Sequence, residues 1–194
     1  MTSQLKIAAI VLAAGQSRRM GPVNKLLMEI EGVPMVERVL LAIQAAGVEK
    51  TIVVTGFESD RIEERLSGYD VEFVWNENFE AGMGSSLAVG AAALAENRFD
   101  GILVCLGDLP YLKKDSIGKV IDAFKKAKGE KIVAPCFEGK RGHPVIFPSH
   151  YKKPLEGLQG DAGARALIQQ EAQNLLELDL SEEGTIRDMD TADA

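Results

Sequence analysis

The chain has 194 residues, of which 46% are hydrophobic, and its formal net charge is −7. This size allows one compact domain with a substantial core, and we expect a single domain over residues 1–194. The negative charge argues against nucleic-acid partners, and the absence of a signal peptide or of an apolar run of ~18 residues predicts a soluble, cytoplasmic protein without membrane partners.

The first predicted strand, 7–12, leads into a turn of small residues, 13–15, that would let a ligand contact the backbone. The charged loop that follows contains Arg18, Arg19 and Lys25, and cations beside a glycine turn are suited to hold a polyphosphate. An ordinary strand–loop connection with solvated cations is the alternative. Neither the Walker spacing nor the three-glycine dinucleotide fingerprint is met here.

The next segment predicts a βαβ unit. An apolar stripe at helical spacing runs over 34–46, with Pro34 at the first helical position. The β-branched run 51–55 predicts the second buried strand. A polar helix over 59–66 and a third strand over 71–75 follow.

Two glycines, Gly82 and Gly84, precede a predicted alanine-rich helix that extends to about Ala95. One interpretation is that Ser85 or Ser86 caps this helix. The other is a ligand site, because a helix N-terminus behind glycines attracts anions.

The most apolar strand, 101–106, leads into Gly107, Asp108 and Pro110. Ligands of open parallel sheets bind at the carboxyl ends of the strands, the edge where Gly15 is also expected. Asp108 is therefore the predicted metal ligand, since Mg²⁺ prefers carboxylate and phosphate oxygens. The alternative is that Asp108 only starts the turn before Pro110.

The remaining elements are a packed helix over 114–127 and strands over 131–136 and 175–180, the last at an edge of the sheet. His143 begins a further apolar strand and follows two cations, whereas His150 has the context of a surface residue.

Asp161 and Arg165 lie in a glycine-rich segment, 158–167. One interpretation is a loop in which Asp161 caps a helix that begins near Ala162, with Arg165 exposed. The acidic tail 186–194 is, by itself, typical of solvated charge.

The alternation of strands and helices predicts a three-layer α/β/α fold with a mostly parallel, Rossmann-like sheet. The only two cysteines, Cys105 and Cys136, fall in apolar strand-like runs. We therefore expect buried free thiols in a reducing cytosol and no zinc site.

The stretch from Ile10 to Leu27 resembles the signature loop of the nucleotidyltransferases that share a GT-A-like fold. In that loop A-A-G or A-G-G, three residues, R-M-G and a nearby Lys follow the first strand, as in residues 13–15, residues 19–21 and Lys25 of this chain. The A-A-G form is similar to that of the molybdenum cofactor cytidylyltransferases among the MobA-like relatives. The guanylyl branch usually reads A-G-G and has Asp where this chain has Asn24.

Further motifs extend the resemblance from about Ile7 to the C-terminus. They are G-M-x-x-S-L at Gly82, Met83, Ser86 and Leu87, G-D-x-P at 107–110, G-H-P at 142–144, G-D-x-G-A-R at 160–165, and an ending similar to D-x-D-T at Asp188, Asp190 and Thr191. The family often has Pro after this Thr, where the chain has Ala192.

The resemblance implies a role for each matching residue. The implied metal, Mg²⁺ or Mn²⁺, is bound by Asp108 and Asp190, with Asp188 as the alternative second ligand. The implied catalytic residues are Lys25, Arg19 and Asp108. The implied nucleotide-binding residues are Leu12, Ala13, Ala14, Gly15, Arg19, Lys25, Thr55, Gly82, Met83 and Ser86, and the implied acceptor-binding residues are His143, Asp161 and Arg165.

The implied reaction moves CMP from CTP onto the phosphate of a small acceptor, a molybdopterin-type cofactor, and releases pyrophosphate. An acceptor phosphate is already an anion, so the reaction needs positioning and charge neutralisation rather than a base. A molybdoenzyme or its chaperone is a further implied partner.

Three alternatives stay open. The first is a guanylyltransferase or sugar-phosphate nucleotidyltransferase of the same fold, and the second is an accessory protein that binds a nucleotide or cofactor without turnover. The third, an NAD(P)-dependent oxidoreductase, would need a third glycine after Gly82 and Gly84, and position 87 is Leu.

Overall fold

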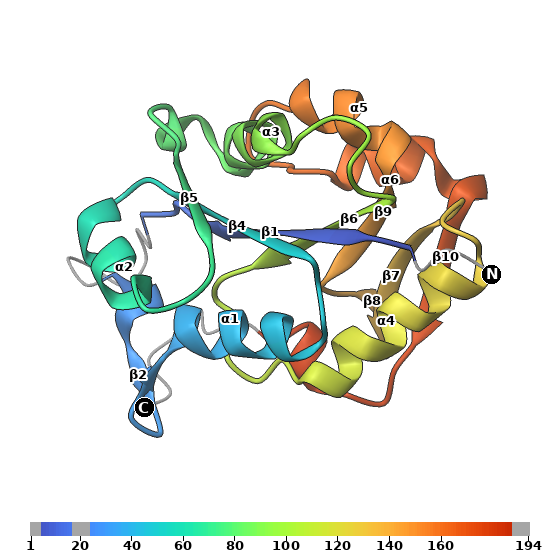
Figure 1. The fold of residues 1–194 in the computed structure, drawn as a ribbon. Coiled ribbons are helices and arrows are strands. Elements are labelled where there is room, and N and C mark those ends of the chain that lie inside the picture. The colour runs from blue at the N-terminus through green and yellow to red at the C-terminus, as the bar shows by residue number, and fades with distance from the viewer. Residues whose placement is uncertain (1–4, 17–23, 188–194) are drawn as a thin grey trace.

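The computed structural model describes residues 5–16 and 24–187, which form one main sheet with helices on both faces (Figure 1). The strands of this sheet, in spatial order, are β10 (Leu175–Asp179), β7 (Ile132–Phe137), β9 (Val145–Pro148), β6 (Gly101–Leu106), β1 (Ile7–Ala13), β4 (Lys50–Thr55) and β5 (Glu72–Trp75). The short strand β8 (Lys140–Arg141) pairs with β7, and a separate hairpin joins β2 (Glu29–Ile30) to β3 (Val33–Pro34).

Strand direction confirms the predicted mostly parallel sheet. Neighbouring strands along the main path are parallel, except that β9 runs antiparallel between β6 and β7. The continuous apolar runs in the sequence are explained by burial on both faces, which parallel strands require. Every residue of β1 is buried, for example.

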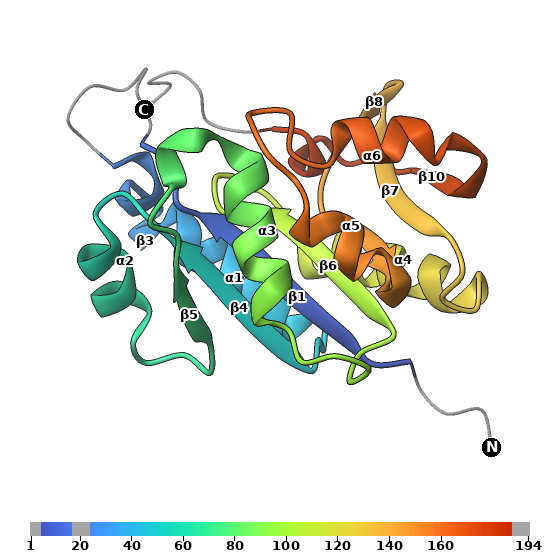
Figure 2. The same ribbon diagram turned by 90° about the horizontal axis from the view of Figure 1, so that it is seen from above.

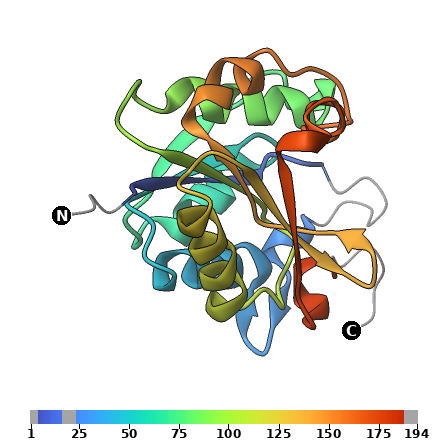
Figure 3. The same ribbon diagram turned by 90° about the vertical axis from the view of Figure 1, so that its right-hand side faces the viewer.

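The helices form two layers, which are seen most clearly from the side of the sheet (Figure 3). One face is covered by α1 (Met35–Ala45), α2 (Ser59–Leu66) and α4 (Lys114–Lys126), and the other by α3 (Met83–Ala93), α5 (Lys152–Glu156) and α6 (Arg165–Gln170). Figure 2 shows the second group lying across the sheet. The predicted three-layer α/β/α arrangement is confirmed, and no helix among the described residues is long and apolar enough to cross a membrane.

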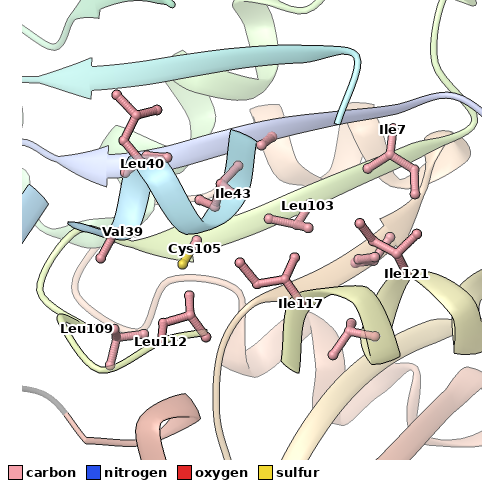
Figure 4. Close-up of a cluster of buried hydrophobic side chains, with 14 of the residues drawn as sticks. Ile7, Val39, Leu40, Ile43, Leu103, Cys105, Leu109, Leu112, Ile117 and Ile121 are labelled. Atoms are coloured by element: carbon pink, nitrogen blue, oxygen red, sulfur yellow. The ribbon is translucent and has the colours of Figure 1, made fainter. Parts of the chain in front are cut away.

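Side chains of β1 alternate between two cores. Val11 joins the cluster on the side of α1 and α4, of which Figure 4 shows Leu103 and Ile43 among other members. Ile10 faces the opposite cluster, under α3. Gly90 permits the close approach of α3, because a Cβ there would lie 2.6 Å from Cγ2 of Ile10.

Two predicted helix starts are wrong. Pro34 is not the first helical residue: it pairs with Glu29 in the small hairpin, and α1 begins at Met35. The alanine-rich helix begins at Met83, before either serine, with Gly82 at the N-cap. Neither serine is the N-cap, so the predicted serine cap does not exist. The side chain of Asn76 donates to both serine hydroxyl oxygens instead.

Two further predictions need correction. Asp161 does not cap a helix at Ala162, because α6 begins only at Arg165 and its N-cap makes no side-chain hydrogen bond. The cysteines are free as predicted, but only Cys105 is buried, and Cys136 is half-buried. Burial raises the pKa of the Cys105 thiol, and the negative charge of Asp108 adds to this, so the thiol stays protonated.

Candidate functional site

The carboxyl ends of β1, β4 and β6 lie side by side, because the three strands are parallel neighbours. The backbone amide of Gly107 donates to the carbonyl of Leu12 at 3.0 Å. On the other side, the amide of Phe57 donates to the carbonyl of Ala14 at 3.2 Å. The turns that follow the three strands therefore form one connected backbone surface, on which Gly15 is exposed.

Lys25 and Asp108 meet at this edge of the sheet. The Nζ of Lys25 lies 2.7 Å from Oδ2 of Asp108, and the two side chains are only 14% and 17% exposed. Lys25 opens the turn η2 (Lys25–Leu27), which is held by the buried Asn24. The Asn24 Oδ1 accepts from the amide of Leu26 at 3.1 Å, and its Nδ2 donates to the carbonyl of Phe57 at 3.5 Å.

The second carboxylate oxygen of Asp108 fits a cation ligand. Oδ1 is buried and has no hydrogen-bond partner among the described residues. A buried carboxylate oxygen without a partner is costly, and a divalent cation would satisfy it. Within residues 5–16 and 24–187 no group of three His, Cys, Asp or Glu side chains gathers around a metal position, so Asp108 is the one predicted metal ligand that can be placed. Asp188 and Asp190, and the predicted phosphate ligand Arg19, lie outside the described residues.

His143 lies beside β6, half-buried, with its Nδ1 3.3 Å from the carbonyl of Val104. A carbonyl only accepts hydrogen bonds, so Nδ1 carries the proton in this contact and Nε2 is left as an acceptor. Burial lowers the pKa of His143, the Val104 carbonyl and Asp108 act against this, and the positive charge of Arg165 adds to it. The ring is neutral at pH 7.

The predicted nucleotide residues Thr55 and Ser86 are engaged with other protein groups. The Thr55 hydroxyl donates to Oε1 of Glu63 at 2.8 Å, and its carbonyl accepts from the amide of Asn76 at 2.8 Å. The Nδ2 of Asn76 lies 3.0 Å from the hydroxyl oxygens of both Ser85 and Ser86. Asn76 is 1% exposed and links the end of β5 to the first turn of α3.

Sequence reasoning missed Asn76. The available signal was a polar residue directly after a predicted strand, at the edge of the sheet where ligands bind. Its hydrogen bonds also explain why Ser85 and Ser86 do not cap α3. The Ser85 hydroxyl donates to the carbonyl of Gly82 at 2.8 Å instead.

The predicted nucleotide segment and the predicted acceptor loop are in direct contact. The amide of Gly84 donates to the carbonyl of Gly160 at 2.7 Å. Gly82 has φ of +105°, and a Cβ there would lie 2.3 Å from Oδ1 of Asp161. Gly163 approaches the side chain of Met83 in the same way, since a Cβ there would lie 2.9 Å from the sulfur. We name residues 82–84 and 158–163 together the glycine clasp.

The other predicted contact residues lie around this clasp and the strand ends. Ala13 is buried, whereas Met83 is 40% exposed. Arg165 is exposed at the start of α6, and its charge acts on His143, so these two predicted acceptor residues belong to one region.

The last described residues, 184–187, contact two segments beside the site. The amide of His143 donates to the carbonyl of Thr185 at 2.8 Å. The guanidinium carbon of Arg187 lies 4.7 Å from the ring centre of Tyr111, in the loop after β6. A Cβ on Gly184 would lie 2.3 Å from the carbonyl oxygen of Tyr111. The backbone that leads to Asp188 thus runs between the loop after β6 and the residues before β9.

Comparison with known proteins gives a family match over most of the chain. The model of a family described as MobA-like NTP transferase domain matches residues 9–175. A nicotine blue oxidoreductase from Paenarthrobacter nicotinovorans is 28% identical over 193 residues, which cover 96% of this chain and 93% of that protein. A probable molybdenum cofactor guanylyltransferase from Methanosarcina acetivorans is 28% identical over 152 residues, which cover 76% of this chain and 65% of that protein.

Other relatives are longer proteins or solved structures. A bifunctional protein GlmU from Syntrophomonas wolfei is 30% identical over 80% of this chain, but the match spans only 33% of that protein. The crystal structure of Rv0371c from Mycobacterium tuberculosis H37Rv has a TM-score of 0.79 at 26% identity, covering 91% of this chain and 88% of that chain. The structure of its complex with manganese has a TM-score of 0.76 at 25% identity, covering 90% and 88%.

Proposed function

We propose, from the premise that this chain belongs to the MobA-like NTP transferase family, that it transfers CMP from CTP to the phosphate of a small acceptor and releases pyrophosphate. The chain is a nucleotidyltransferase by family. The nucleotide and the acceptor are the proposed part, and the acceptor we propose is a molybdopterin-type cofactor. A molybdoenzyme or its chaperone would then receive the product.

The observation that carries this proposal is the contact of Lys25 with Asp108 at the joined carboxyl ends of β1 and β6. A cation and a carboxylate side by side, next to a small-residue turn, provide separate anchors for phosphate oxygens and for a metal ion. Lys25, together with Arg19 from outside the described residues, would bind the phosphates. Asp108 and Asp190, or Asp188 in its place, would hold Mg²⁺ or Mn²⁺, which when bound offsets the negative charge of the phosphates.

The remaining residues would position the two substrates. An acceptor phosphate oxygen attacks the α-phosphorus as the bond to the pyrophosphate oxygen breaks, and this requires in-line placement rather than a base. The surface formed by residues 12–15, Thr55, and the segment 82–86 would hold the nucleotide. His143, as a neutral acceptor at Nε2, would contact the second substrate with Asp161 and Arg165.

The choice of CTP rests on the A-A-G turn and on Asn24 in place of Asp. Asn24 is 1% exposed and holds η2, so the residue at this position affects how Lys25 is presented. A relative named as a probable guanylyltransferase makes GTP the competing nucleotide.

A second candidate function is oxidoreduction, because the relative named nicotine blue oxidoreductase matches nearly the whole chain. A dinucleotide fingerprint requires a strand that leads directly into the glycine turn. In this chain Gly82 follows the 3-10 turn η3 (Phe79–Ala81) instead, and β5 ends at Trp75. This geometry favours the transferase.

The test is pyrophosphate release by the purified protein with Mg²⁺ and molybdopterin, comparing CTP, GTP, ATP and UTP. Release with CTP alone supports the full proposal, and release with GTP keeps the reaction but overturns the choice of base. No release with any nucleotide overturns the proposed reaction. Oxidation of NADH and NADPH with nicotine blue is measured in parallel, and turnover there would establish the second candidate.

A further inference from the structure

The ion pair of Lys25 and Asp108 joins the two groups that the proposed reaction needs for different ligands. The Nζ of Lys25 lies 2.7 Å from Oδ2 of Asp108. In the proposed reaction Lys25 binds phosphate and Asp108 binds a metal ion, so each member of the pair has to take up a ligand of its own. The free protein therefore differs from the loaded one in what neutralises Asp108.

A metal ion that binds Asp108 while the pair is intact meets an ammonium group at close range. Lys25 occupies Oδ2, and the remaining oxygen, Oδ1, belongs to the same carboxylate, so an ion at either oxygen lies within a few ångström of Nζ. The two side chains are 14% and 17% exposed, and charges this sheltered are screened less than surface charges. Repulsion between the ammonium and a divalent cation is therefore substantial.

A nucleotide removes this conflict. Its phosphates bring enough negative charge for both cations, and the flexible four-carbon stem of Lys25 lets the ammonium move without a backbone change. Hydrogen bonds hold the backbone next to both residues of the pair. Asn24 accepts from Leu26 within η2, beside Lys25, and the amide of Gly107, beside Asp108, donates to the carbonyl of Leu12. The side chain of Lys25 is thus the part that can switch partners.

We infer that Lys25 is an internal counter-ion that keeps divalent metal off Asp108 until nucleotide phosphates draw it away. Metal and nucleotide then bind cooperatively, and by linkage each raises the affinity for the other by the same factor. The inference rests on the proposed function, since it assumes a triphosphate ligand. It adds a second role for Lys25, which makes metal binding conditional on the nucleotide.

The test measures Mn²⁺ binding to the protein without nucleotide, and electron paramagnetic resonance quantifies the Mn²⁺ that stays free. Lys25→Met should bind Mn²⁺ about tenfold more tightly than the wild type, within the 5–150-fold range usual for coupling between sites. Lys25→Arg retains the positive charge and should bind as weakly as the wild type. Lys50→Met, which removes a lysine paired with Glu72 on the surface, should change nothing.

A non-hydrolysable CTP analogue completes the cycle. It should raise the Mn²⁺ affinity of the wild type by a larger factor than that of Lys25→Met. Thermal unfolding shows whether each variant is folded, and Lys25→Gln replaces Lys25→Met if the latter is not.

The outcomes separate this inference from the proposed function. If Asp108→Asn weakens Mn²⁺ binding but Lys25→Met does not tighten it, the counter-ion role is overturned and the metal assignment survives. If Asp108→Asn leaves Mn²⁺ binding unchanged in the Lys25→Met background, both fail. If Lys25→Met binds Mn²⁺ more tightly than the wild type and the additional change Asp108→Asn removes this gain, the counter-ion role is supported. This holds even if pyrophosphate release fails with all four nucleotides.

Discussion

The two sides of the candidate site are held together by different forces. At the ends of β1 and β6, the ion pair of Lys25 and Asp108 is sheltered and charged. At the start of α3, the glycine clasp depends on backbone contact, with the Gly84 amide 2.7 Å from the Gly160 carbonyl. One side should therefore be sensitive to the removal of charge, and the other to the addition of a single methyl group.

The largest effect should come from the charged side. Asp108→Ala is expected to abolish Mg²⁺-dependent pyrophosphate release, because it removes the only predicted metal ligand that the described residues supply. The fold should persist, since Asp108 lies in a loop beyond the end of β6. Circular dichroism shows whether the variant is folded, and a pyrophosphate assay measures its turnover. Asp122→Ala, on the exposed side of α4, is the matched control, and full turnover by Asp108→Ala would refute the metal assignment.

Lys25→Ala should reduce the rate less completely. The loss of one cation in a sheltered site is expected to cost on the order of 10² to 10³ in kcat, by analogy with a lost oxyanion donor. The measurement is kcat at saturating nucleotide and Mg²⁺, with Lys50→Ala as the control. A rate within a factor of two of the wild type would show that the charged side does not need this lysine.

Gly84→Ala tests the glycine clasp. The new Cβ would lie 2.6 Å from the carbonyl carbon of Gln159, so the loop must shift. Displacement of the loop should lower kcat/KM for the acceptor by about 10-fold to 10²-fold. The control is Gly118→Ala in α4, where a Cβ meets nothing within 4 Å and should be tolerated. Unchanged acceptor kinetics would mean that the clasp does not position the acceptor.

Asn76→Ala should affect stability more than chemistry. It removes a buried amide that bonds Ser85 and Ser86, and unpaired buried polar groups cost about 1–3 kcal/mol. Urea unfolding measures this loss. Gln173→Ala, at an exposed position, should stay within about 0.5 kcal/mol of the wild type, and an equally stable Asn76→Ala would contradict the linking role.

The smallest effect concerns His143. Burial lowers its pKa in the folded protein, so below the ordinary value near 6.5 the unfolded chain binds a proton that the folded chain does not. The free energy of unfolding should therefore fall as the pH drops through this range, and His143→Gln should reduce that dependence. Urea unfolding between pH 5.5 and 8 tests this, with the exposed His150→Gln as the control. If the free energy of unfolding depends on pH in the same way for the wild type and His143→Gln, the contribution of His143 is rejected.

The sequence predicts the strands well because local composition determines them. The run 7–12 is apolar throughout, and a strand buried on both faces needs nothing else to be recognised. The sequence predicts that Lys25 binds phosphate and that Asp108 binds a metal ion, and the structure brings their side chains together. The roles of these residues stay predictions.

What could not be predicted depends on contacts between distant segments. Ser85 and Ser86 are residues of a type that caps helices, but the side chain of Asn76 donates to both hydroxyl oxygens. The position of Asn76 after a strand does not reveal which side chains it will bond. The clasp depends on Gly160 meeting Gly84 from a loop more than seventy residues away in the chain. The antiparallel insertion of β9 between β6 and β7 is likewise a matter of strand order, which periodicity does not encode.

The reversed strand β9 has a consequence for engineering. Val145 pairs with Val104, so the residues before β9 emerge at the edge of the sheet where β6 ends. His143 therefore reaches the site from the beginning of a strand, on a segment separate from those that carry Lys25 and Asp108. A designer could replace residues 138–144 to accommodate a different second substrate while Lys25 and Asp108 are left intact, which makes this connection between β7 and β9 a natural place to graft new specificity.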